Sequence, residues 1–328
     1  MRTRQLVLNA VTAAVTVALL GLLAIPAVRI LRASDTEPHR TFGVYVDPWH
    51  ADDWARAVGV QPDLVAKFES FSRRRTAKRF LDEVERQGVR RALIAWEPWK
   101  PVPFSATAGQ QARPQPGYRN IDIALGAQDD YIRAFARSLA SFDGTVYLRY
   151  AHEMNGYWYP WSVDPIAYRL AWRHVVELVR SVAPNVLFVW SVNPSLYQPF
   201  DAWSRGLRQY WPGPRYVDVV GATMINFGGR KTYDVTRFAA RIRALQWDYG
   251  KPIMLAETNT AYEGRVAWLR ELRQMLATMP FVRSVVWSQL PSHAAANARG
   301  AGVGFLDWDV RRDPTSSAEL QAIARDGR

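Results

Sequence analysis

One segment in the middle of the chain gathers side chains that could bind and hydrolyse a sugar. Residues 147–161 read Tyr-Leu-Arg-Tyr-Ala-His-Glu-Met-Asn-Gly-Tyr-Trp-Tyr-Pro-Trp. An apolar strand pattern ends there, and His152, Glu153 and Asn155 follow, with Trp158 and Trp161 close behind. The carboxylate, amide and imidazole can bond sugar hydroxyls, and flat aromatic faces can stack on the C–H faces of pyranose rings. The alternative interpretation is a buried loop whose tryptophans belong to the core.

A second carboxylate follows another apolar run about a hundred residues later. Residues 251–259 read Lys-Pro-Ile-Met-Leu-Ala-Glu-Thr-Asn, so Glu257 follows an apolar strand pattern and begins a polar turn. Glu153 and Glu257 would then be two glutamates on separate strands that face one cleft. Glycoside hydrolysis needs such a pair, because one carboxyl protonates the leaving oxygen while the other attacks or activates water.

The elements that must position these glutamates alternate between short apolar runs and amphipathic helical patterns. Eight strands, mostly followed by helices, predict an α/β fold of the (β/α)8 TIM barrel type, with a doubly wound open sheet as the alternative. In a barrel, catalytic groups lie at the carboxyl ends of strands, where Glu69, Glu97, Glu153 and Glu257 occur. The expected strands are 42–46, 64–68, 91–95, 145–149, 186–190, 216–221, 252–256 and 282–287.

These motifs resemble glycoside hydrolase family 26, the β-mannanase family. The segment His-Glu-Met-Asn-Gly at 152–156, with the aromatic residues after it, is similar to the strand-four signature of that family. The segment Leu-Ala-Glu at 255–257 is similar to its strand-seven nucleophile segment. Trp-Glu-Pro-Trp at 96–99 and the strand at 216–221 also look like family segments. The resemblance covers most of residues 42–310.

The resemblance implies a barrel, retaining hydrolysis and a set of roles. Glu153 matches the general acid/base and Glu257 the nucleophile. His152 matches a residue that orients the nucleophile and binds the sugar next to it, and Trp287 matches an aromatic platform under that sugar. The full set of candidate substrate-binding residues is His152, Asn155, Trp158, Trp161, Trp287, Trp96 and Arg149.

The chain departs from the family pattern after its sixth strand. Thr223 and Ile225 stand where an Asp and a Tyr are expected, and the Tyr hydroxyl would bond the nucleophile. This departure indicates a divergent branch resembling exopolysaccharide-associated bacterial members. The sequence therefore predicts a retaining, mannanase-like endo-β-glycanase that acts on a polysaccharide, with an exported exopolysaccharide as a candidate. The alternative is a non-catalytic polysaccharide-binding or assembly protein on a degenerate barrel.

Composition excludes several other classes of protein. The 328 residues include no cysteine, which excludes a disulfide scaffold, a thiol nucleophile and Cys-ligated zinc. The five histidines lack zinc-ligand spacing, and neither a phosphate-binding loop nor a Gly-x-Ser-x-Gly motif occurs, so we expect no metal and no cofactor. The net charge of +12 comes from scattered arginines and does not indicate nucleic-acid binding. We expect a monomer.

The first 33 residues differ from the rest of the chain. Two arginines precede an apolar run, and residues 11–28 carry no charge, which is about long enough to span a bilayer. We expect 1–33 to be a membrane anchor or a signal peptide, 34–40 a linker, and 41–328 the catalytic domain. The body would then be extracytoplasmic and anchored to the membrane, with a secreted protein as the alternative.

Overall fold

The computed structural model describes residues 39–46, 50–102, 107–228, 233–261, 263–289, 293–294 and 305–328. The expected membrane anchor and most of the expected linker lie outside these residues. Within them, none of the helices combines the length and the apolar character that a membrane span requires. The barrel unit comprises Arg40–Arg328.

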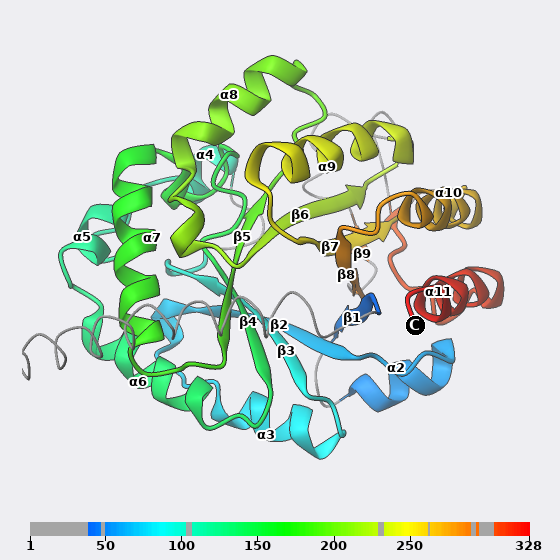
Figure 1. Ribbon diagram of the computed structural model, residues 1–328, viewed down its shortest axis with the longest axis horizontal. Coiled ribbons are helices and arrows are strands. Elements are labelled where there is room, and N and C mark those ends of the chain that lie inside the picture. Colours follow the sequence, from blue (N-terminus) through cyan, green and yellow to red (C-terminus); the bar gives the residue numbers. More distant parts are fainter. Residues whose placement is uncertain are drawn as a thin grey trace, which may run out of the picture. The chain divides into compact units, whose positions relative to one another are not determined.

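Eight parallel strands close into a barrel, which confirms the (β/α)8 prediction (Figure 1). Closure is made by β1 against β8, where Thr41 pairs with Ser284, and this pairing excludes the open sheet. The strands are β1 (Thr41–Tyr45), β2 (Leu64–Ser70), β3 (Arg91–Glu97), β4 (Thr145–Tyr150), β5 (Val186–Val192), β6 (Val219–Asn226), β7 (Ile253–Thr260) and β8 (Val282–Ser288).

Helices surround the strands on the outside (Figure 1). The longest described helix, α7 (Pro165–Arg180), is capped by Asp164, whose carboxylate accepts hydrogen bonds from two main-chain N–H groups, with Pro165 in the first helical position. The other helices are α2 (Ala51–Val58), α3 (Lys78–Arg86), α4 (Ala108–Gln111), α5 (Asn120–Ala124), α6 (Asp129–Ala140), α8 (Phe200–Tyr210), α9 (Val235–Tyr249), α10 (Arg265–Ala277) and α11 (Pro314–Asp326).

Most strands continue past the apolar run that predicts them, and β6 is the most displaced. It runs over 219–226 instead of 216–221, because Pro214–Tyr216 forms a short 3-10 turn before it. The hydrogen-bond ladder continues into polar residues such as Thr223 and Thr260, which a hydrophobic pattern does not include. These polar extensions form the mouth of the barrel.

Alternation along the strands determines which side chains reach that mouth. The barrel interior is filled by apolar residues that include Leu93, Ala95, Tyr147 and Val189. Because side chains alternate between the two faces of a strand, the next inward positions along β3, β4 and β5 are 97, 149 and 191. These positions hold Glu97, Arg149 and Ser191. The interior therefore changes from apolar to polar at the carboxyl ends of the strands.

A bulge in β7 brings Glu257 inside as well. Ala256 belongs to the interior cluster, so strict alternation would turn Glu257 outward. The register with both neighbouring strands shifts here, between Ala222 and Thr223 on β6 and between Leu255 and Thr258 on β7. A β-bulge re-aims the following side chain, and Glu257 consequently reaches the interior.

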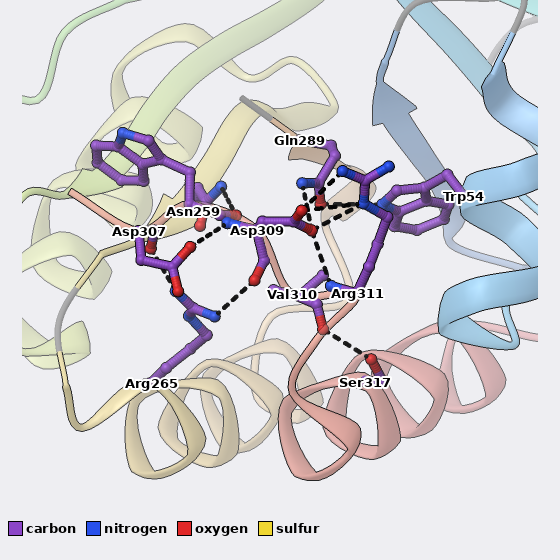
Figure 2. A network of polar contacts seen from close by, with 10 residues as sticks. Trp54, Asn259, Arg265, Gln289, Asp307, Asp309, Val310, Arg311 and Ser317 are labelled. Atoms are coloured by element: carbon purple, nitrogen blue, oxygen red, sulfur yellow. Dashed lines mark hydrogen bonds and ion pairs between the residues drawn. The ribbon is translucent and has the colours of Figure 1, made fainter. Parts of the chain in front are cut away.

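A polar network joins the end of β7 to the segment that precedes α11 (Figure 2). Buried Arg265, at the start of α10, donates hydrogen bonds to the carbonyl oxygens of Thr260, Asp307 and Asp309. Asn259, two residues after Glu257, donates to the carbonyl oxygens of Ser288 and Trp308. The segment leading to α11 is thereby fastened to the strand that carries Glu257.

Candidate active site

Arg149 lies at the centre of the polar mouth and is fully buried. Its guanidinium donates through Nε to Ser191 Oγ at 2.9 Å, through Nη1 to Glu257 Oε2 at 2.6 Å, and through Nη2 to Thr223 Oγ1 at 3.1 Å. Gly221 makes room for this arrangement, since a Cβ there would lie 2.9 Å from Ser191 Oγ. One arginine thus links four neighbouring strands, β4 to β7.

Glu257 is the carboxylate that Arg149 holds, and 14% of its side chain is exposed. Burial raises the pKa of Glu257, and the nearby charge of Glu153 raises it further, while the Arg149 guanidinium lowers it. The charges of Glu153, which follows β4, and of Glu257 in β7 therefore act on each other. The free oxygen of Glu257 is the one that could attack a sugar.

Glu153 is buried at the end of β4, and both of its carboxylate oxygens accept hydrogen bonds. Trp158 Nε1 donates to Oε2 at 3.0 Å and Asn193 Nδ2 donates to Oε1 at 3.0 Å. The main chain of Glu153 has a left-handed φ of 52°, which is costly for a residue other than glycine. Gly156 is needed beside it, since a Cβ there would lie 2.6 Å from the Trp158 ring.

His152 is buried next to Glu153 and is held in its neutral form. Its Nε2 shares a hydrogen bond of 3.1 Å with the Tyr159 hydroxyl, and its ring lies against Phe68 and Trp161. Burial brings the pKa of His152 well below its ordinary value, and the positive charge of Arg149 acts in the same direction. A neutral imidazole can orient neighbours but does not supply a proton at neutral pH.

A cavity of about 610 Å³ opens beside Glu153. Trp158, Asn193 and Thr223 line it together with Ile225, one of the two residues that depart from the family pattern. Its remaining walls are largely aromatic and include Tyr157, Tyr197, Phe227 and Phe238. This combination of a carboxyl group with flat apolar rings is suited to a sugar.

The family model described as glycosyl hydrolase family 26 matches residues 119–272. That range contains β4 to β7 with both glutamates and Arg149. By this match, residues 119–272 are similar to glycosyl hydrolase family 26.

Two curated relatives also match the chain. Endoglucanase H of Acetivibrio thermocellus is 28% identical over 203 residues, which are 57% of this chain and 20% of that protein. A β-1,3-xylanase of a Vibrio species is 33% identical over 102 residues, 30% of this chain and 21% of that protein. The chain therefore spans about a fifth of the length of the curated relatives it matches.

Solved structures share the fold. A family 26 β-mannanase from Bacteroides ovatus has a TM-score of 0.63 at 16% identity, covering 92% of this chain and 94% of its own. The catalytic domain of a family 26 endo-β-1,4-mannanase from Bacillus sp. JAMB-750 has a TM-score of 0.61 at 15% identity, covering 92% and 89%.

Three of the tryptophans expected to bind substrate lie in the core of the barrel domain, namely Trp96, Trp287 and Trp161. Trp96 and Trp287 are fully buried in the cluster outside the strands, because their neighbours Ala95 and Val286 occupy the inward positions. Trp96 stacks on Phe135 of α6 with ring centroids 4.4 Å apart. For these indoles, the core interpretation replaces the platform interpretation.

The loop after β4 divides its aromatic residues between the core and the cavity. Trp161 is buried, stacks on Tyr159 with ring centroids 4.3 Å apart, and donates from Nε1 to the His152 carbonyl oxygen. Trp158 lines the cavity and Tyr157 is exposed. Asn155 bonds the main chain of Asn193 with both ends of its side chain and so supports the site.

Some site residues are absent from the sequence-based set. Asn193 directly follows β5, three residues past the end of the strand expected at 186–190, and its place near that strand end is the only signal that could have found it. Ser191 and Thr223, the other partners of Arg149, also lie at strand ends. Glu69 lies at a strand end as well, but it pairs with Lys67 near Phe80 of α3, outside the barrel. In the described part of the chain, no cluster of His, Asp or Glu could hold a metal ion.

Glu97 is a third carboxyl group of the site. It ends β3 and accepts a hydrogen bond of 3.2 Å from Trp99 Nε1. The pKa of Glu97 is raised to about 7, mainly by burial; the Trp99 hydrogen bond and the Arg149 charge oppose this rise, and the Glu257 charge adds to it. A carboxyl group in this state is protonated in mildly acidic solution and charged in alkaline solution.

Replacing Glu97 by glutamine is expected to stabilise the protein more at pH 8.5 than at pH 5. The folded-state pKa of about 7 lies above the ordinary 4.5, so wild-type stability falls as pH rises through that window, and glutamine removes this loss. The difference should be about 2–3 kcal/mol in the free energy of unfolding. Urea unfolding at both pH values measures it. The same change at exposed Glu263 is the control, and an equal response of both variants to pH would contradict the assignment.

Proposed function

We propose that this protein is a family 26 retaining glycoside hydrolase that cleaves β-glycosidic bonds within a polysaccharide, with Glu153 as acid/base and Glu257 as nucleophile. One observation supports this most directly: the buried Arg149 of β4 holds Glu257 of β7, and Glu153, which follows β4, lines a cavity with aromatic rings in its walls. The cavity is larger than a single sugar ring, which is consistent with endo-action on a polymer.

The arrangement can carry out both steps of a retaining reaction. Glu153 donates a proton to the glycosidic oxygen as the bond to the anomeric carbon breaks, and Glu257 forms a covalent ester with that carbon. Glu153 then takes a proton from water, the water oxygen attacks the anomeric carbon, and Glu257 leaves as a carboxylate. Arg149 stabilises the charge of Glu257 before attack and after departure.

The substrate we propose first is a β-mannan, because the solved structures with this fold include family 26 mannanases. The names of the curated relatives add an endoglucanase and a β-1,3-xylanase. The full chain should therefore be incubated with linear mannan, galactomannan, mixed-linkage glucan, β-1,3-xylan and carboxymethyl cellulose. New reducing ends measure cleavage, and proton NMR of the first product identifies the anomer. We expect cleavage of mannan with retention, and first release of the inverted anomer would contradict the mechanism.

The second candidate function is polysaccharide binding without turnover. It is favoured by Ile225, an apolar residue that lines the cavity where the family pattern has a hydroxyl donor. Affinity electrophoresis on the same glycans distinguishes the two functions. Retarded migration with no new reducing ends, unchanged in the Glu153→Gln and Glu257→Gln variants, would support this function in place of hydrolysis.

We further propose that residues 1–33 anchor the protein to the membrane, that the barrel is extracytoplasmic and monomeric, and that its natural polymer is an exported exopolysaccharide. The uncharged run at 11–28 is the support for the anchor. Membrane fractionation with a carbonate wash, followed by protease treatment of intact cells, tests this placement. Recovery of the protein in the culture medium would indicate a cleaved signal peptide.

A further inference from the structure

Asn193, the first residue after β5, is fixed through its main chain. The Asn155 side chain donates from Nδ2 to the Asn193 carbonyl oxygen at 2.7 Å and accepts at Oδ1 from the Asn193 N–H at 2.9 Å. Trp203 of α8 donates from Nε1 to the same carbonyl oxygen at 3.0 Å. These three bonds hold the Asn193 backbone in place without using its carboxamide.

The orientation of that carboxamide follows from its other neighbour. The Ser195 main-chain N–H donates to Asn193 Oδ1 at 2.8 Å. A main-chain N–H cannot accept a hydrogen bond, so the oxygen must face Ser195 and the NH2 group must face Glu153. Asn193 Nδ2 lies 3.0 Å from Glu153 Oε1. An amide nitrogen can only donate, so Oε1 must accept and cannot direct a proton toward Asn193.

The other oxygen of Glu153 has a partner that can move. The Trp158 indole N–H is also a donor only, so the observed bond uses Oε2 as an acceptor and disfavours a proton on that oxygen while the bond lasts. Trp158 is only partly buried and lines the cavity, whereas Asn193 is anchored on three sides. The Glu153 main chain is itself fixed by a bond of 2.8 Å from its N–H to the Ser191 carbonyl oxygen. Turning one ring frees Oε2, whereas no comparable movement frees Oε1.

We propose that Asn193 is a positioning residue that assigns the catalytic proton to Oε2 of Glu153, an inference that rests on the hydrolytic function proposed above. A glycan entering the cavity meets the Trp158 ring, and displacement of the indole N–H leaves Oε2 free to carry the proton. That proton passes to the glycosidic oxygen as the oxygen takes the electron pair of the breaking bond. Asn193 keeps the carboxyl group oriented throughout by holding Oε1.

Two variants at this position separate proton placement from structural support. Asn193→Ala removes the donor to Oε1 and the acceptor for Ser195. Asn193→Asp keeps the size and the acceptor for Ser195 but places an oxygen against Oε1, which draws a shared proton to the wrong side of Glu153. If Asn193 has only a structural role, Asn193→Asp should lose less activity than Asn193→Ala. If Asn193 assigns the proton, Asn193→Asp should lose at least as much activity as Asn193→Ala.

The measurement is kcat/KM on paired substrates, because this ratio reports the step in which the leaving group departs. Phenyl β-mannobioside needs a proton on its leaving oxygen and 2,4-dinitrophenyl β-mannobioside does not; the matching cellobiosides are run in parallel. Both variants should lose about 10–100-fold on the phenyl substrate, part of what general acid catalysis contributes, and under about threefold on the dinitrophenyl substrate. Asn155→Ala loosens the main chain of Asn193 but leaves the Asn193 carboxamide in place. Its loss of kcat/KM should therefore differ less between the phenyl and dinitrophenyl substrates.

Three results would count against the inference. Equal losses on both substrates, a change in KM alone, or an Asp variant milder than the Ala variant would each overturn the role of Asn193 while leaving hydrolysis intact. Absence of wild-type turnover on every aryl substrate and on the polymers would instead overturn the proposed function, and the role of Asn193 with it. Circular dichroism of each variant confirms that the barrel is folded.

Discussion

Glu257→Gln is expected to lower polysaccharide hydrolysis by about four orders of magnitude or more, a loss typical of removing a nucleophile. A glutamine amide does not attack an anomeric carbon, so the covalent intermediate cannot form. Its side-chain oxygen can still accept the Arg149 hydrogen bond, and the site should keep its shape. Reducing-end assays should therefore show almost no turnover, while calorimetry shows glycan affinity close to that of the wild type.

The contrast with Glu153→Gln makes this result diagnostic. That variant should lose polymer cleavage but retain formation of the intermediate from dinitrophenyl glycosides, because their leaving group needs no proton. Added azide should then release a glycosyl azide from the Glu153 variant and not from the Glu257 variant. Glu263→Gln, the same change at an exposed position, serves as the control. Turnover above about a tenth of wild type in the Glu257 variant would exclude it as the nucleophile.

Arg149→Met is expected to have the largest effect on stability, about 3–5 kcal/mol less free energy of unfolding at pH 8. The guanidinium is fully buried and bonds three side chains, so its removal leaves the Glu257 carboxylate without a counter-charge. Arg149 opposes the burial that raises the pKa of Glu257, so that pKa should rise further in the variant. The nucleophile would then be protonated over more of the neutral range, and activity should fall with stability.

The rise in the Glu257 pKa also determines how the stability loss of Arg149→Met depends on pH. A carboxyl group with a raised folded-state pKa contributes stability at low pH that is lost as pH rises, so the deficit should shrink toward pH 5. Adding Glu257→Gln should recover part of the loss at pH 8, since a neutral amide needs no counter-charge. Urea unfolding of the single and double variants measures both effects, with exposed Arg205→Met as the control. A deficit that is independent of pH and of Glu257 would show that Arg149 acts by packing alone.

The sequence alone predicted the barrel, which the structure confirms, and it named Glu153 and Glu257 as the candidate catalytic pair. Apolar runs separated by amphipathic helices determine a parallel sheet covered on its outer side, and parallel strands bring their carboxyl ends to one rim. Glu153 and Glu257 each follow or end such a run, so chain order puts both near that rim. Glu257 is bonded there to Arg149, and Glu153 lines the cavity that also contains Thr223, another partner of Arg149.

Only the tertiary structure decided on which side of its strand each tryptophan lies. Both sides of a strand in a parallel barrel are apolar, so hydrophobicity does not say whether Trp96 or Trp287 points inward. The inward positions go to the small or branched neighbours Ala95 and Val286, and the large indoles pack among the outer helices. The same uncertainty applies to the loop after β4, where Trp158 reaches the cavity and Trp161 does not.

The catalytic geometry itself also depends on contacts between segments far apart in the chain. The bulge that turns Glu257 inward exists only where β7 is paired with β6 and β8. Asn193 becomes part of the site because Asn155, 38 residues earlier, fixes its backbone. The sequence by itself determined which chemical groups the site contains, since that depends on residue type and strand order. The tertiary structure decided which atoms face one another, because register, bulges and long-range hydrogen bonds are properties of the packed chain.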